Sequence, residues 1–241
     1  MAPGPRGVPA GNQYEHGVAI FGGTRMTVED VRIDDVFGDG VMTAPSGWHY
    51  SQNVLAGQLP RDVLIQRVTI ESTQRMCIGF TGGIGLTVQD SSLSDCRYAG
   101  VDLETDVPGE KLQNVKVLRN TISGFYLFAI GVAGPTFAPP QPDDISGIEI
   151  RGNITPTHSD TCWPAVNAER GPISNMVVAG NPDLKSQGDS VRLTDVQGGS
   201  VTANKLTLTK GLHWCASPSV PVRLAGTTTG VTVSGNTTVG Y

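Results

Sequence analysis

The stretch NVKVLRNTI (residues 114–122) has the skeleton apolar-x-apolar-x-x-Asn-x-apolar. The same skeleton with its Asn recurs four times downstream, as IEIRGNI (148–154), MVVAGNPDL (176–184), VTANKL (201–206) and VTVSGNTT (231–238). Upstream it recurs three times with the Asn replaced, as MTVEDVRI (26–33), VLIQRVTI (63–70) and LTVQDSSL (86–93). Eight copies separated by 23 to 37 residues indicate a repeat architecture rather than a single globular core.

A second short element precedes each copy, for example GVMT (40–43), GVDL (100–103) and SVRL (190–193). Each unit therefore contains several very short strands joined by tight turns, consistent with the 31 glycines and 16 prolines of the chain. Such units bury their apolar residues only by stacking on one another. The pattern predicts an all-β, right-handed parallel β-helix of about eight coils over residues 16–241, after an irregular segment 1–15. The five aligned Asn residues predict an Asn ladder along one turn.

With this skeleton and these Asn positions, the chain resembles the right-handed parallel β-helix proteins of the pectate-lyase-like superfamily, from about His16 to Tyr241. The resemblance implies an extracellular protein that acts on polysaccharides, as most members do. Members usually begin with a capping helix, and this sequence shows none, so we expect an N-terminal truncation or a partner that covers the first coil. The catalytic motifs of polygalacturonases (N-T-D, D-D, G-H-G, R-I-K) are absent in register, so no catalytic residue is assigned by motif.

Composition excludes several classes of function. The net charge of −5 and the lack of a Lys/Arg-rich run argue against a nucleic-acid partner. No apolar run approaches the roughly 20 residues that cross a bilayer, which argues against membrane insertion. No P-loop or other cofactor-binding motif occurs, so we expect no organic cofactor. The four cysteines allow a bridge between Cys162 and Cys215 or isolated buried thiols.

Alternation along the first strand of each coil places its second and fourth residues outward. The second positions, in coil order, are Ala19, Met42, Gly79, Asp102, Gly131, Asn167, Arg192 and Arg223. The fourth positions are Phe21, Ala44, Thr81, Glu104, Ala133, Glu169, Thr194 and Ala225. Carboxylates thus flank small side chains on one outward face, where a shallow, water-exposed trough is expected.

Two kinds of chemistry fit this face. Asp102, Glu104 and Glu169 provide carboxyl groups for glycoside hydrolysis, which uses an acid and a second carboxylate. In the lyases of the superfamily such carboxylates hold Ca²⁺, so the resemblance also implies Asp102, Glu104 and Glu169 as Ca²⁺ ligands and Arg192 as the base or substrate clamp. The remaining alternative is a solvated surface whose charges only maintain solubility.

Further substrate-binding candidates lie around this face. Asn167 and Arg223 are outward, and four aromatic residues in insertions can stack on sugar rings, namely Trp48, Tyr50, Trp163 and Trp214. Asp39 in the turn GDG (38–40) aligns with His16 one coil earlier, either as acid–base machinery or as caps of backbone amides.

These features predict a secreted β-helix protein that binds a polysaccharide or oligosaccharide and cleaves or modifies it as a lyase or glycoside hydrolase. An acidic face repels an acidic glycan, so the hypothesis requires either Ca²⁺ or a neutral substrate. The alternative is a non-catalytic structural or adhesive β-helix, such as a tailspike-like protein. The sequence leaves open whether the protein is an enzyme and whether it is a monomer or a trimer.

Overall fold

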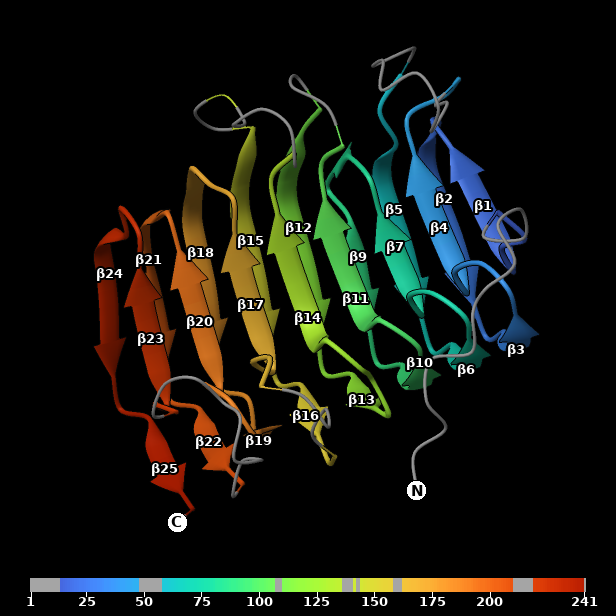
Figure 1. Cartoon of the computed structure of the whole chain (residues 1–241). Helices are drawn as coiled ribbons and strands as arrows, with labels where there is room; N and C mark the ends of the chain where they lie inside the picture. Colours follow the sequence, from blue (N-terminus) through green and yellow to red (C-terminus); the bar gives the residue numbers. More distant parts are fainter. Residues whose placement is uncertain are drawn as a thin grey trace.

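The computed structural model describes residues 14–47, 58–106, 110–135, 141, 144–157, 162–209 and 219–240. These residues form twenty-five β-strands that pair in parallel and build three sheets. Figure 1 shows the coils stacked in chain order, from the N-terminal coil in blue to the C-terminal coil in red. The predicted parallel β-helix of about eight coils is confirmed. Within the described residues, no helix has the length and apolar character needed to cross a membrane.

The first sheet carries the outward face that the sequence singles out. Its strands, in spatial order, are β1 (Val18–Phe21), β4 (Val41–Ala44), β7 (Ile78–Phe80), β11 (Ala99–Glu104), β14 (Phe128–Ala133), β17 (Val166–Glu169), β20 (Val191–Thr194) and β23 (Val222–Ala225). Each strand comes from the next coil along the chain, so neighbours in the sheet are about 4.8 Å apart.

The second sheet follows the first in every coil. Its strands, in spatial order, are β2 (Thr24–Glu29), β5 (Arg61–Gln66), β8 (Gly83–Ile84), β12 (Leu112–Leu118), β15 (Ile145–Arg151), β18 (Ile173–Ala179), β21 (Val196–Thr202) and β24 (Thr229–Ser234). A further strand, β9 (Thr87–Gln89), continues β8 and pairs with β5 and β12.

The third sheet closes each coil. Its strands, in chain order, are β3 (Arg32–Val36), β6 (Thr69–Thr73), β10 (Ser92–Cys96), β13 (Thr121–Ser123), β16 (Ile154–Thr155), β19 (Asp183–Ser186), β22 (Lys205–Leu208) and β25 (Thr237–Val239). The repeated skeleton of the sequence therefore spans the end of a second-sheet strand, a turn and the start of a third-sheet strand.

The core is a continuous stack of apolar side chains that point inward from all three sheets. On the first sheet, Val41, Ile78, Val101, Ile130 and Val166 pair in register and are fully buried. Full burial of such a side chain stabilises the fold by about 1.5–3 kcal/mol. Because these residues alternate with outward ones, the core fixes which side chains the outward face presents.

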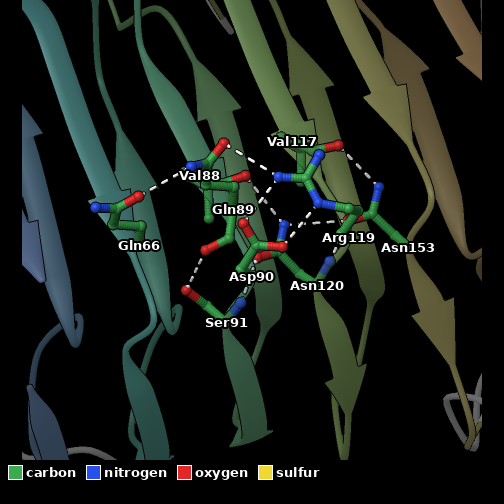
Figure 2. Close-up of polar contacts among 9 residues, drawn as sticks. All are labelled: Gln66, Val88, Gln89, Asp90, Ser91, Val117, Arg119, Asn120 and Asn153. Atoms are coloured by element: carbon green, nitrogen blue, oxygen red, sulfur yellow. Dashed lines mark hydrogen bonds and ion pairs between the residues drawn. The ribbon is translucent and has the colours of Figure 1, made fainter. Parts of the chain in front are cut away.

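The predicted Asn ladder runs along the turn between the second and third sheets (Figure 2). Oδ1 of Asn153 accepts the backbone N–H and the side-chain Nδ2 of Asn120 at 3.0 and 3.1 Å. Nδ2 of Asn153 also donates to the carbonyl of Val117, in the preceding coil, at 2.8 Å. The pattern continues through Asn181, Asn204 and Asn236. Ser91 takes the place of Asn in the third coil and receives the same bond from Val68.

Each of these turns begins with a residue in the left-handed backbone region. They are Asp30, Arg67, Asp90, Arg119, Gly152, Gly180, Ala203 and Gly235. The four charged residues form two ion pairs between neighbouring coils. Arg67 binds Asp30, and Arg119 binds Asp90 (Figure 2). These pairs are exposed, so each contributes little to stability, about 0–1 kcal/mol.

The structure decides between the two expectations for the cysteines, a bridge or isolated thiols. Cys77 and Cys96, which the sequence analysis left unpaired, are fully buried and form a disulfide across 19 residues. They lie in the third coil, beside β7 and at the end of β10. Cys162 is also disulfide-bonded. Residue 215, its suggested partner, lies outside the described residues. The alternative of isolated thiols is therefore wrong for Cys77, Cys96 and Cys162.

Candidate functional site

The register of the outward face agrees with the alignment drawn from the sequence. Asp102 on β11 pairs with Gly79 on β7 and with Gly131 on β14. The same column continues through Asn167 and Arg192 to Arg223. In the parallel column, Glu104 pairs with Ala133 and Ala133 pairs with Glu169. The two glutamates are thus separated by two coil spacings, about 10 Å between Cα atoms.

The expected water-exposed trough is wrong in the column of Asp102. Only 5% of Asp102 and 1% of Asn167 are exposed. The glycines beside Asp102 leave room that other side chains fill. The carboxylate of Asp39 lies over Gly79, and the ring of Phe128 lies over Gly131. Sequence alternation identified the glycines but not the residues that cover them, because Asp39 comes from the turn before β4 and Phe128 is the first residue of β14, ahead of the aligned positions.

Asp39 and His16 cap backbone amides, which is one of the two roles expected for them. Nδ1 of His16 accepts the backbone N–H of Asp39 at 3.0 Å. Oδ1 of Asp39 accepts the backbone N–H of Met76 at 3.1 Å and lies 3.6 Å from Nε of Arg75. Burial raises the pKa of Asp39 above its usual range, although the charge of Arg75 opposes the shift. Burial also lowers the pKa of His16, which favours a neutral imidazole.

Asp102 and Glu104 have the most perturbed carboxyl groups of this face. Burial raises the pKa of Asp102 well above its usual value, and the nearby charges of Glu104 and Asp39 add to the effect. Burial, followed by the charge of Asp106, raises the pKa of Glu104 to about 7. The side chain of Glu104 remains 26% exposed. Glu104 is therefore the carboxyl group that both reaches solvent and exchanges its proton near neutral pH.

Two arginines complete this group of charges, and the sequence analysis missed both. Nη2 of Arg170 lies 3.5 Å from Oε2 of Glu104. Arg75, in the turn after β6, acts on Asp39, Asp102 and Glu104 by its charge. Arg170 directly follows the outward Glu169, which was the available signal. Arg75 offered none, because turns of variable length do not align by period.

Several buried polar atoms of this region have no hydrogen-bond partner within the described part of the chain. They include Nη1 of Arg75, a donor, Oδ1 of Asn167, an acceptor, and Oγ1 of Thr105. Buried polar groups are normally satisfied, so an unsatisfied one requires an explanation.

The C-terminal end of the same face is basic, because the outward column ends in Arg192 and Arg223. Asp189, in the turn before β20, is 1% exposed and binds both Arg192 and Arg223. Burial alone would raise the pKa of Asp189, but hydrogen bonds from Arg223, the Val220 amide and Arg192 lower it. A charged guanidinium donates hydrogen bonds and accepts none, so this geometry suits Arg192 as a binding group rather than as a base.

The other expected site residues are placed as follows. Trp163 packs its ring edge against Phe128, with centroids 6.1 Å apart and planes at 69°. Trp48, Tyr50 and Trp214 lie outside the described residues. Among the residues that the structure describes, no group of three or more His, Cys, Asp or Glu side chains is arranged to hold a metal ion. Ca²⁺ binding by Asp102, Glu104 and Glu169 stays a prediction.

Comparisons with known proteins add little to this description. No protein-family model matches the chain. It is similar to the uncharacterized protein YclG of Bacillus subtilis (strain 168), with 26% identity over 129 residues. The match covers 49% of this chain and 22% of YclG, so it spans about a fifth of that relative's length. No solved structure matches.

Proposed function

We propose that the protein is a glycan-cleaving β-helix enzyme and that Glu104 is its general acid. The observation that carries this proposal is the environment of Glu104, which has a pKa of about 7 and a side chain that is 26% exposed. A carboxyl group that is protonated near neutral pH can donate its proton to a leaving oxygen. The parallel β-helix and its resemblance to the pectate-lyase-like superfamily support a polysaccharide or oligosaccharide as the substrate.

Glu169 is the second carboxylate of the proposed pair. It lies in the same outward column, two coils from Glu104, with Ala133 between them in register. A separation of about 6.5–9.5 Å between carboxyl groups leaves space for a water molecule and is typical of inverting glycoside hydrolases. The Cα spacing of about 10 Å is compatible with this range.

The reaction then uses one water molecule and no cofactor. Glu104 gives its proton to the glycosidic oxygen as the bond from that oxygen to the anomeric carbon breaks. Glu169 takes a proton from the water whose oxygen attacks the anomeric carbon from the opposite side. The products are two shorter glycans, and the new anomeric hydroxyl group of one of them has the inverted configuration.

Asp102 and Arg170 act as positioning residues in this scheme. Asp102 is buried beside Glu104, and its negative charge, when present, opposes ionisation of its neighbours. Arg170 lies against Oε2 of Glu104, and its positive charge lowers the pKa of this carboxyl group. It therefore opposes part of the increase in pKa that burial causes. The buried disulfide between Cys77 and Cys96 is consistent with the proposed location outside the cell.

The test is hydrolysis of a panel of neutral and acidic polysaccharides by the wild type, Glu104→Gln and Glu169→Gln. We expect each variant to lose about 10²–10⁴-fold in rate, the usual contribution of an acid or base. Glu149→Gln, on the second sheet, is the matched control and should retain full activity. Proton NMR of the first product should show inversion. The proposal fails if the wild type cleaves no glycan, if the variants retain activity, or if configuration is retained.

A further inference from the structure

Asp189 holds two arginines of neighbouring coils in one fixed arrangement. Its Oδ2 accepts Nε–H of Arg192 at 3.0 Å and Nε–H of Arg223 at 2.7 Å. Its Oδ1 accepts Nη2–H of Arg223 at 3.1 Å and the backbone N–H of Val220 at 3.0 Å. The carboxylate is buried and its contacts are charge-assisted, so the two side chains are held in place before any ligand arrives.

This arrangement has an excess of positive charge. One carboxylate faces two guanidinium groups, and the arginine side chains remain 31% and 32% exposed. Arg192 uses Nε and Nη2 for Asp189, and its Nη1 forms no hydrogen bond with any residue in the described ranges. A partly exposed guanidinium with a fixed orientation is suited to planar or tetrahedral oxyanions.

In the second coil, the position equivalent to Asp189 is occupied by Asp39, whose surroundings differ in charge. Asp39 stands two residues before β4 as Asp189 stands two residues before β20, and each accepts an amide of the next coil. However, Asp39 has one arginine near it, at 3.6 Å, and lies among carboxyl groups. The outward face therefore changes from acidic near Asp102 to basic at Arg192, three coil spacings away, about 14 Å.

We propose that Arg192 and Arg223 form a subsite for an anionic substituent, a carboxylate or a sulfate, of the bound glycan. The inference deepens the proposed function, because the subsite lies on the sheet that carries Glu104 and Glu169. It also restricts the substrate. The carboxyl groups at coils four to six favour a neutral sugar at the bond that is cleaved, while the anionic group lies further along the chain. A uniformly charged polyuronide does not fit this distribution.

The test is binding to an array of matched tetrasaccharides. Each backbone is present in three forms that end in a neutral hexose, in the corresponding uronate or in the 6-sulfated hexose. Glu104→Gln protein is used throughout, so that cleavage does not deplete the array. We expect at least one backbone to bind at least 10-fold more tightly in an anionic form than in its neutral form. Whether the uronate or the sulfate is preferred identifies the source of the charge.

The double replacement Arg192→Gln/Arg223→Gln should remove this preference, so that the anionic and neutral forms of each backbone bind equally. Arg151→Gln, an exposed arginine of the second sheet, is the control and should keep the preference. Arg192→Lys/Arg223→Lys retains the charge and should keep part of the preference, which separates a lost subsite from a misfolded protein. The inference is overturned if no backbone shows the preference or if the preference survives in the Gln variant.

The two proposals fail in different ways. Loss of cleavage in all assays, with the anionic preference intact, contradicts the proposed function alone. Cleavage of a neutral glycan by Glu104, with no anionic preference in the array, contradicts the subsite alone.

Discussion

Oδ2 of Asp39 lies 3.0 Å from the position that a Cβ atom on Gly79 would occupy. The contact joins a turn of the second coil to a strand of the third. It brings the carboxyl group of Asp39 close enough to Asp102 for its charge to raise the pKa of that group. A glycine is therefore needed at position 79 because a side chain there would displace the carboxylate of Asp39. Its backbone conformation is that of an ordinary strand and does not itself require glycine.

Replacing Gly79 with Ala should displace the carboxylate of Asp39 and lower the free energy of unfolding by about 1–3 kcal/mol, as overpacking does. Gly131→Ala should cost at least as much, because its methyl group would collide with the ring of Phe128. Urea denaturation of both variants measures the effect. Unfolding midpoints equal to that of the wild type would show that neither glycine is required by its neighbour.

The contribution of each Asn of the ladder to stability should depend on how deeply that Asn is buried. Asn153→Ala leaves the amide of Asn120 and the carbonyl of Val117 without partners in a fully buried site. Each unsatisfied buried group costs about 1–3 kcal/mol, so we expect a loss of about 3 kcal/mol. Asn236→Ala, at the last and more exposed rung, should cost less because water replaces the lost bonds. Chemical denaturation compares the two variants, and equal losses would show that burial of the rung does not determine its contribution.

Glu104 should make stability depend on pH. Its pKa is raised from 4.5 to about 7, so between these values the folded state binds more protons than the unfolded state. Stability due to this group is then greatest below pH 4.5 and falls as the pH rises toward 7, by at most about 1.4 kcal/mol per pH unit. Relative to the wild type, Glu104→Gln should gain stability across this window. Thermal unfolding at several pH values tests this, with Glu149→Gln as the control. A constant difference between the wild type and Glu104→Gln would contradict it.

The disulfide should stabilise the third coil. Cys77 and Cys96 are 19 residues apart, and closing a loop of about this length stabilises the folded state by roughly 3 kcal/mol. The double variant Cys77→Ala/Cys96→Ala should unfold at a correspondingly lower urea concentration. Reduction of the wild type under denaturing conditions, followed by refolding in reductant, should cause at least this loss, because it also opens the disulfide of Cys162. If neither measurement shows a change, the disulfide does not contribute to the stability of the folded state.

Much of the architecture could be predicted from the repeat around Asn120. Its skeleton gave the number of coils, the ladder and the pairing of Asp102 with Gly79 and Gly131. This succeeds because strand alternation has a period of two and because stacked coils place equivalent residues side by side. The register of Glu104, Ala133 and Glu169 follows from the same rule.

The environment of the candidate site followed no such rule. The sequence placed Asp102 outward, but the structure buries it between two glycines whose open space is filled by Asp39, from a turn, and by Phe128, from the start of β14. Arg75 and Arg170 also come from turns and corners, whose lengths vary from coil to coil. The disulfide between Cys77 and Cys96 was missed for the same reason.

The sequence by itself thus determined the coils, the ladder and which side chains leave the core, since each depends on a local pattern repeated in every coil. Only the tertiary structure decided which of those side chains are buried, which charges meet them and how their pKa values change. Those properties depend on desolvation and on charges brought together from turns tens of residues apart, and no periodic pattern records them.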